Sequence, residues 1–500
     1  MAVTKQVEPP GEVSAPHAAG GLRKTMRWYD GSIVCLSAFG FMLSTVGYSI
    51  GALGALGALA LWALSAVFGA IQTRIFVEPA TMLADSSGGL SAFAREAWRR
   101  WQNLIAPLTG FGYWIAYTST LSAFGLIAGQ LIQAEWFSSA TWTLRPLGIS
   151  IGLAQLLAVA MILGVWVINV AGMSPTIKFG RITGVLFVLV LALFAFLPYL
   201  TGDFHPRFLT WNIGAAGQSW GGVKLAIVYL YLMGWSCYPT EQAATFAPEY
   251  ENTGEDTHRA LVTTAIIGLA VFTLVPLGLG GVLDSGTIAA NPIAFFVIEL
   301  TKMMGSAGAS IAVVLILIAC LLTMNASTMN ASRALYATSH RGYTIRVFGR
   351  LNRHSVPANA MTLDMVVNVL VVILLNSVIG IVAASNMAYF VVVILALAGV
   401  IALRRVMPDH HRPIRLGRGW LVLAGVFAVI NTVLLVVGST SFQESGYGGW
   451  NDFFVGLGAL VLGIVLYLWR TLVQDRRRVM WRDPRPYVGD ARVLGDTLEL

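Results

Sequence analysis

Apolar segments long enough to cross a lipid bilayer recur along this chain. Only 11% of the residues are charged and the mean hydropathy is +0.72, whereas a soluble domain carries roughly 25% charged residues. A transmembrane helix needs about 20 apolar residues. The sequence therefore predicts an all-α polytopic membrane protein with about twelve transmembrane helices. We expect the spans near 31–50, 52–82, 106–134, 147–171, 179–201, 221–247, 260–283, 306–336, 358–384, 386–403, 419–439 and 452–471.

The positive charges favour one side of this arrangement. With the N-terminus inside, 27 lysines and arginines fall in cytoplasmic segments and four, Arg145, Arg207, Lys224 and Lys302, fall outside. Such an asymmetry sets the orientation of membrane proteins, so we expect a multi-pass protein of the cell (cytoplasmic) membrane with both termini cytoplasmic. The net charge of +8 then comes from basic cytoplasmic loops that face anionic lipid headgroups. It does not indicate a nucleic-acid partner.

Few charged residues remain within or beside the predicted spans. Arg74 and Glu78 are four residues apart in the second span, which places them on one helix face and predicts an ion pair. Glu299 and Lys302 are expected to cap an outer helix end. The three cysteines lie in apolar segments, so neither a disulfide framework nor a zinc site is indicated.

The sixth predicted span is interrupted at its centre. Gly234, Ser236 and Pro239 lie there, followed by Glu241. Proline removes a backbone donor and disrupts a helix. A carboxylate at membrane depth is costly and is by default a candidate functional group. A broken helix beside an acid is typical of the place where a transporter binds its substrate.

The first span also carries small and polar residues. Ser44, Thr45 and Gly47 crowd its middle and outer half, and the segment Ser44–Tyr48 is a candidate for unwinding. Small residues also serve close helix packing, so that alternative stays open. Interruptions five spans apart are expected from a five-plus-five inverted repeat with discontinuous helices 1 and 6.

Two broken helices would form a receptor for an α-amino acid. The half-helix after the first break offers free N–H groups and a partial positive charge, which suit a carboxylate. The half-helix that ends near Met233 and Gly234 offers free carbonyls, which suit an ammonium group. Irregular backbone is tolerated at membrane depth where it lines a cavity.

Several motifs, in order, resemble those of the amino acid–polyamine–organocation permease family. They are Ser86-Ser-Gly-Gly89 before an aromatic helix, Gly110-Phe-Gly-Tyr-Trp114, Asn169-Val-Ala-Gly172, Glu249 with Asn252 and Arg259, and Ser332-Arg-Ala-Leu-Tyr-Ala337 followed by Gly342. The resemblance implies twelve helices with a ten-helix inverted-repeat core. We expect this core at 28–405 and two additional helices with a basic linker at 406–473. A disordered N-terminal segment 1–27 and a cytoplasmic tail 474–500 flank them.

The arginine–agmatine exchangers of that family carry a Trp-Ser and a Glu in span six. Trp235, Ser236 and Glu241 stand at the same spacing, which implies that Trp235 covers the substrate as a gate and that Glu241 couples binding to movement. The family's first-span motif is replaced by Ser44, Thr45, Val46 and Gly47.

Two departures argue against arginine as the substrate. Where the exchanger has a pocket asparagine and a stacking tryptophan, this chain has Leu121 and Ser327. We expect a smaller, neutral amino acid whose side chain meets Tyr117, Cys237 and Ser327.

The function expected is that of a secondary active transporter (permease) that works by alternating access, by proton coupling or exchange. Hydroxyls of Thr323, Ser327 and Thr328 could serve sodium, but such hydroxyls usually bond to their own helix, and the proton is the preferred ion. An amine carrier for polyamine or ethanolamine is the alternative, and it would need an acid in the pocket. An ion channel, which needs a continuous polar pore, is a further alternative. No enzyme motif, cofactor or metal ligand set is apparent.

Overall fold

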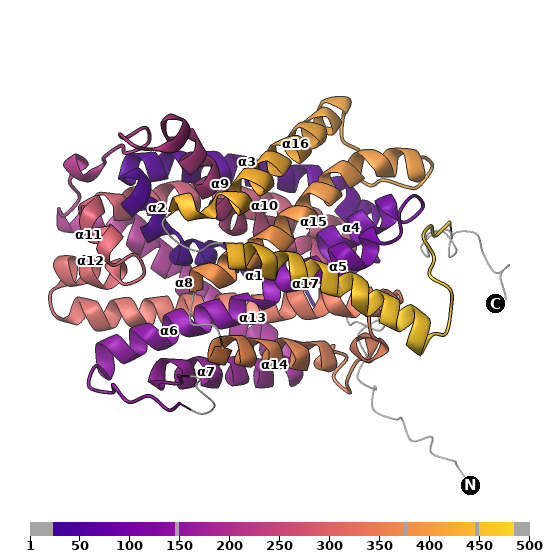
Figure 1. Ribbon diagram of the computed structural model, residues 1–500, viewed down its shortest axis with the longest axis horizontal. Helices are drawn as coiled ribbons and strands as arrows, with labels where there is room; N and C mark the ends of the chain where they lie inside the picture. The colour runs from indigo at the N-terminus through magenta and orange to yellow at the C-terminus, as the bar shows by residue number, and fades with distance from the viewer. Residues whose placement is uncertain (1–23, 146–149, 375–377, 446–449, 485–500) are drawn as a thin grey trace, which may run out of the picture.

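The computed structural model describes residues 24–145, 150–374, 378–445 and 450–484, and over these residues the chain is a bundle of helices (Figure 1). Two isolated β-bridges and no strands occur in this part of the chain. Nine of its helices are long and apolar enough to cross a membrane, and a bent pair makes a tenth candidate. The all-α polytopic architecture expected from the sequence is confirmed.

The uninterrupted spans are long helices. They are α3 (Ala55–Met82), α7 (Leu153–Val170), α8 (Met173–Thr201), α10 (Thr253–Gly280), α13 (Ala307–His340), α15 (Val378–Val406), α16 (Arg418–Thr440) and α17 (Trp450–Trp469). Shorter helices connect or support them: α4 (Gly89–Trp98), α11 (Ser285–Ala290), α12 (Phe295–Met304) and α14 (Ala358–Leu374). The third span consists of α5 (Ile105–Thr118) and α6 (Thr120–Trp136), which meet at Ser119.

Apolar side chains cover the outside of the bundle as well as its core. Val422 and Val429 of α16 are 66% and 65% exposed, although both would be unfavourable on a surface in contact with water. In a bilayer that surface faces lipid tails, so a helix can be apolar on every side.

The first span is bent by 41° between α1 (Trp28–Gly40), with its 3-10 extension η1 (Phe41–Ser44), and α2 (Val46–Leu53). Thr45 lies at the break with φ −131° and ψ −17°, and the Ser44 hydroxyl donates to the Phe41 carbonyl at 2.7 Å. A side chain that bonds to the local backbone competes with the helical ladder. The interruption therefore covers Phe41–Thr45, and the expectation of unwinding over Ser44–Tyr48 is wrong for Val46–Tyr48, which are helical.

The sixth span is also discontinuous. α9 runs over Val223–Cys237, and the 3-10 helix η5 continues over Tyr238–Glu249. The α-helix thus ends at Cys237, later than the expected end near Gly234, because the constraint comes from Pro239. Proline has no N–H for the carbonyl four residues earlier, so the α-helical hydrogen bonds cannot continue past this point, although Tyr238 itself keeps helical angles of φ −82° and ψ −28°.

Two predicted spans fall short of a full apolar helix. α9 has 15 residues, and α14 has 17. They correspond to the predicted spans 221–247 and 358–384, and neither is among the nine long helices.

Both described ends of the chain pack against the bundle. Residues 1–23 of the predicted disordered segment 1–27 lie outside the described residues, but Met26 forms a bridge with Tyr250. The Arg27 guanidinium donates to Glu251 at 2.9 Å. In the tail, the Asp483 N–H donates to the Arg99 carbonyl at 2.8 Å. The last residues of segment 1–27 and the first of segment 474–500 are therefore ordered against the core.

Candidate functional site

The two helix breaks meet through an aromatic stack. The rings of Phe41, in η1, and Trp235, in α9, lie 4.6 Å apart with an interplanar angle of 15°. Trp235 Nε1 donates to the Ala116 carbonyl of α5 at 3.3 Å. Both aromatic side chains are buried. The stack and this hydrogen bond join the first, third and sixth spans, and the gate role of Trp235 stays a prediction.

Glu241 lies four residues after the end of α9 and is held by three phenols. Tyr117 donates to its carboxylate at 2.9 Å, Tyr113 at 3.0 Å and Tyr389 at 3.1 Å. These tyrosines come from α5 and α15. Phenolic O–H groups stabilise a carboxylate without supplying a cation, so the carboxylate can exchange a proton without breaking an ion pair.

Several buried hydroxyls have no hydrogen-bond partner among the described residues, and three of them belong to predicted site residues. These three are Thr45 at the first break, Ser236 beside the second, and Ser327 on α13. All three residues are at most 1% exposed. Buried polar groups are nearly always hydrogen-bonded, and an unpaired one calls for an explanation. A polar ligand held between the breaks would supply the missing partners.

The remaining predicted site residues have other neighbours. The Ser44 hydroxyl is used within the break, as described above. A side chain on Gly47 would overlap the Pro292 carbonyl, so this glycine permits close packing. The carbonyl of Cys237 lies against Gly69 of α3. Leu121 is buried on α6 and offers no polar atom. Among these residues, the candidates for a polar contact with a substrate are the backbone N–H groups of Val46 and Gly47, which lie in the first turn of α2.

Two of the candidate sodium ligands bond to their own helix. Thr323 Oγ1 donates to the Ala319 carbonyl at 2.8 Å, and Thr328 Oγ1 donates to the Met324 carbonyl at 2.9 Å. Such back-bonding is usual for hydroxyls inside apolar helices. Ser327 differs, because its hydroxyl has no such bond, which leaves it available to a ligand.

A buried ion pair lies at the far end of η5. Arg333 of α13 donates to both carboxylate oxygens of Glu249 and, at 3.0 Å, to the Met329 carbonyl. Its guanidinium lies 5.2 Å from the centre of the Phe246 ring. The Glu249 carbonyl accepts the Met26 N–H at 3.0 Å. This contact joins η5, α13 and the segment before α1.

Four residues of this region were not predicted as site residues from the sequence. They are Tyr113, which belongs to the motif Gly110–Trp114, and Phe41, Tyr389 and Asp364. Asp364 of α14 is fully buried and accepts from Trp114 Nε1 at 2.5 Å and from Thr118 Oγ1 at 3.0 Å. Two of these residues could have been noticed as polar side chains within apolar segments. Asp364 lies inside the predicted span 358–384, and Tyr389 lies near the start of the span 386–403.

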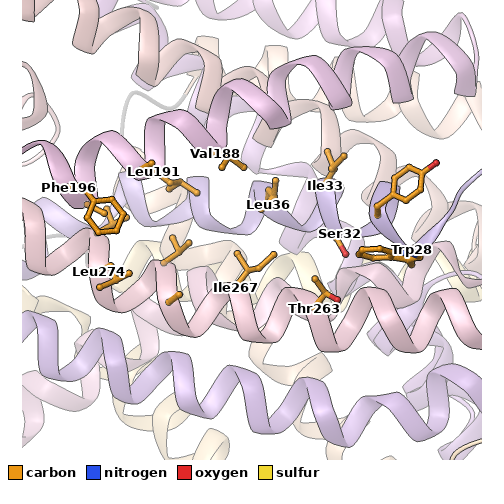
Figure 2. Close-up of a pocket in the computed structure, with 16 residues that line it drawn as sticks. Trp28, Ser32, Ile33, Leu36, Val188, Leu191, Phe196, Thr263, Ile267 and Leu274 are labelled. Carbon is orange, nitrogen blue, oxygen red and sulfur yellow. The ribbon is translucent and has the colours of Figure 1, made fainter.

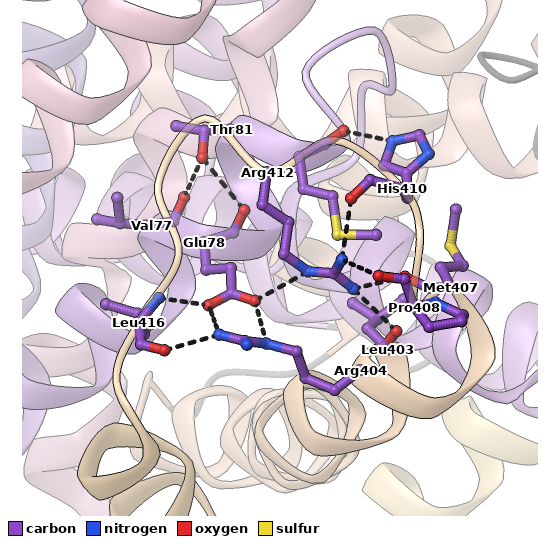
Figure 3. Close-up of polar contacts among 11 residues, drawn as sticks. Val77, Glu78, Thr81, Leu403, Arg404, Met407, Pro408, His410, Arg412 and Leu416 are labelled. Atoms are coloured by element: carbon purple, nitrogen blue, oxygen red, sulfur yellow. Dashed lines mark hydrogen bonds and ion pairs between the residues drawn. The ribbon is translucent and has the colours of Figure 1, made fainter.

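The predicted Arg74–Glu78 pair is wrong. Glu78 instead accepts from Arg404 Nε and Nη2, both at 2.6 Å, and from the Leu416 N–H at 2.8 Å. Arg412 forms a longer ion pair with the same carboxylate at 3.2 Å (Figure 3). Arg74 lies near His258, with 3.4 Å between Nη1 and Nε2. Spacing within one helix could not indicate partners that lie on another span and its loop.

The expected helix cap at Glu299 is also wrong. Glu299 is completely buried and, among the described residues, its carboxylate has no hydrogen-bond partner. Lys302 donates instead to the Val282 carbonyl, just beyond α10, at 2.7 Å.

Comparison with known proteins gives one family and one fold. A family described as "Amino acid permease" matches residues 31–464. The general amino acid permease AGP3 of Saccharomyces cerevisiae is 29% identical over 45% of this chain and 40% of its own length. The lysine-specific permease LysP of Escherichia coli is 26% identical over 50% of this chain and 51% of its own length. The matched parts thus span about half of these relatives or less.

A solved structure extends the likeness to nearly the whole chain. The manganese transporter of Eremococcus coleocola superposes with a TM-score of 0.57 over 91% of this chain and 98% of that one, at 13% identity. At this identity the likeness concerns the fold alone.

Proposed function

Because the chain belongs to the amino acid permease family, we propose that it is a secondary active transporter that carries an amino acid across the cell membrane by alternating access. The observation that carries this proposal is the meeting of two interrupted helices at the Phe41–Trp235 stack, beside buried hydroxyls that lack partners. Interrupted helices present backbone groups to a substrate at membrane depth, where an uninterrupted helix has none to offer.

The two breaks suit the two ends of an α-amino acid. The N–H groups of Val46 and Gly47 open α2 and carry the partial positive charge of a helix N-terminus, which suits a carboxylate. At the end of α9, the Trp235 carbonyl lacks the usual α-helical donor, because Pro239, four residues later, has no N–H. That carbonyl suits the ammonium group. Val46, Gly47 and Trp235 would then bind the part of the substrate that all α-amino acids share.

The groups around the breaks favour a neutral side chain. Thr45, Ser236 and Ser327 offer hydroxyls, and Leu121 and Cys237 are weakly polar or apolar. The carboxylate nearest the second break, Glu241, already accepts from three phenols. One relative is named for lysine and another as a general permease, but a cationic side chain would here compete with those phenols.

We assign the coupling of transport to Glu241. Its position within η5, four residues after the end of α9, ties its protonation to the conformation of η5, and its phenol partners lie on α5 and α15. Gain of a proton would change how the carboxyl group bonds to these phenols and so alter the contact between three spans. A proton is therefore the coupling ion we propose, in symport or exchange.

The Arg333–Glu249 pair would close the site on the side where both described chain ends lie. We propose that this side is cytoplasmic, since most lysines and arginines belong to segments there. Opening toward the cytoplasm would require η5 to separate from α13. Trp235 would close the opposite side.

A ligand screen tests the function. Purified protein is unfolded thermally in the presence of each common amino acid, putrescine, spermidine or ethanolamine. A ligand at about 100 times its Kd stabilises the folded state by roughly 2.7 kcal/mol, so neutral amino acids should raise the Tm. Stabilisation by amines alone, with none by any amino acid, would contradict the proposal.

The same screen separates the site from general effects. Ser327→Ala removes an unpaired hydroxyl and should reduce the shift given by the best ligand. Ser385→Ala is the matched control, because the Ser385 hydroxyl donates to the Ile381 carbonyl of its own helix at 2.8 Å. Its ligand response should equal that of the unmodified protein.

A further inference from the structure

A groove of about 530 Å³ opens on the outside of the bundle between α1, α8 and α10 (Figure 2). No charged side chain lines it, and although Ser32, Thr263, Tyr29 and Trp28 are among the lining residues, the surface that faces the groove is apolar. Val188 and Phe196 are 48% and 52% exposed, so the groove faces the surroundings of the bundle. On a membrane-spanning helix those surroundings are lipid.

The groove has the length of one lipid leaflet. Along α10 its lining extends from Thr263 to Val275, and this stretch covers about 18 Å at the helical rise. Half of a hydrocarbon core of about 30 Å is roughly 15 Å. One acyl chain, running parallel to the helices, would fill the groove from end to end.

Small residues create the groove. Ala192 and Ala195 of α8 and Ala270 of α10 are part of its lining. Ala192 and Ala270 are themselves exposed, so a larger side chain at either position would fill the groove without displacing the packed core. The groove therefore depends on these small side chains, and a single substitution at one of them can fill it.

One end of the groove carries the chemistry of a membrane interface. Trp28 and Tyr29 lie there, and tryptophan and tyrosine are enriched at the level of lipid headgroups. The Arg181 guanidinium lies 5.6 Å from the centre of the Tyr29 ring. Arg181 pairs with Asp30 at 2.7 Å, yet its side chain is 47% exposed.

A second cation stands on the same helix face. Lys178 precedes Arg181 by three residues, so the two lie side by side on α8. Lys178 is exposed and forms no hydrogen bond or ion pair with another described residue. Val188 follows Arg181 on this face by seven residues, or about 10 Å. Through its contact with the Tyr29 ring, Arg181 lies at the end of the groove that Trp28 and Tyr29 form, with Lys178 one turn further along α8. A headgroup at this end of the groove would meet both basic residues.

We propose that this groove is a binding site for an anionic glycerophospholipid, with one acyl chain between α1, α8 and α10 and its headgroup at Lys178 and Arg181. The bound chain would contact Ser32, Ile33 and Leu36, on the part of α1 that precedes the break at Phe41–Thr45. The lipid would support that half-helix against α8 and α10. This inference does not depend on which substrate the protein carries.

Photolabelling of the full-length protein in lipid nanodiscs tests the proposal. The probe is phosphatidylglycerol with a diazirine on one acyl chain, and labelled peptides are identified by mass spectrometry. Peptides of α1, α8 and α10 that line the groove should be labelled preferentially. Ala192→Phe and Ala270→Phe should each reduce this labelling, whereas Val429→Phe on the lipid-facing side of α16 should not. Equal labelling in all three variants would overturn the proposal.

The headgroup is tested with phosphatidylcholine that carries the same diazirine chain. Groove labelling by this probe should be weaker than labelling by phosphatidylglycerol. Lys178→Gln should weaken phosphatidylglycerol occupancy about fivefold, since one basic residue near an anionic surface contributes about 1 kcal/mol. Arg405→Gln, at an exposed arginine of α15, is the control. Equal labelling by both lipids would overturn the assignment of an anionic headgroup.

Discussion

Glu241 and Asp364 are buried carboxylates held by adjacent faces of one helix, α5. Tyr117 donates to Glu241 at 2.9 Å, and the next residue, Thr118, donates to Asp364 at 3.0 Å. Glu241 lies directly after an interrupted helix, whereas Asp364 lies within the continuous helix α14. Both acids accept hydrogen bonds from neutral donors, but Glu241 belongs to the 3-10 helix η5 beyond the end of α9, whereas the backbone around Asp364 is a regular α-helix.

This difference predicts a structural role for Asp364. Asp364→Asn keeps an oxygen that accepts from Trp114 and Thr118, so the Tm should stay near that of the unmodified protein. Asp364→Leu leaves both donors buried and unpaired, which costs about 1–3 kcal/mol for each, and should lower the Tm clearly. Equal Tm values for the two variants would contradict this role.

Trp235→Ala should weaken substrate binding. The variant loses the ring stacked on Phe41, and an aromatic pair contributes about 0.5–1.5 kcal/mol beyond its buried area. We expect KM for uptake to rise between about twofold and tenfold. Trp235→Phe keeps an aromatic ring, so its KM should lie between those of the unmodified protein and Trp235→Ala. Trp469→Ala, at a 53% exposed position of α17, is the control, and an unchanged KM for Trp235→Ala would rule out the gate.

Removing only one partner of the Arg333–Glu249 ion pair should lower the stability of the folded protein strongly. Either Arg333→Met or Glu249→Leu leaves an uncompensated buried charge, which typically costs about 3–5 kcal/mol. The double variant removes both charges, so its Tm should recover above that of either single variant. Glu255→Ala breaks the exposed pair with Arg259 and should change stability by no more than about 1 kcal/mol. Additive losses in the double variant would contradict the coupling.

Glu78 should hold the loop between α15 and α16. Glu78→Gln removes the charge that faces Arg404 and Arg412, and these two cations would then repel each other. We expect faster trypsin cleavage within residues 406–417, measured on membrane vesicles open on that side. Asp409→Asn, at an exposed position of the same loop, is the control. Equal cleavage rates in the two variants would show that Glu78 does not anchor the loop.

The sequence located the helices well because a bilayer imposes a length and a composition on each span. It placed both interruptions within a few residues, since Pro239 and the polar run at Ser44 and Thr45 act locally. The exact limits differed. Ser44 bonds back to Phe41 and moves the first break earlier, whereas α9 continues up to the residues before Pro239.

Contacts between segments that are far apart in the sequence could not be predicted from the spacing of residues within one helix. Glu78 has a suitable partner four residues away in Arg74, but folding brings Arg404 to it from another span. Tyr389 lies 148 positions from Glu241 and has no local feature that links it to that acid. The substrate-binding residues proposed from the sequence stay predictions, because their roles depend on a ligand and not on the fold.

Transport in proteoliposomes tests the central claim most directly. Purified protein is supplied with a radiolabelled neutral amino acid from the ligand screen, with and without an imposed pH gradient. The unmodified protein and Asp364→Asn should accumulate it in response to the gradient. Glu241→Gln should lose this response, because its side chain cannot exchange a proton. Gradient-driven accumulation by Glu241→Gln equal to that of the unmodified protein would contradict the account.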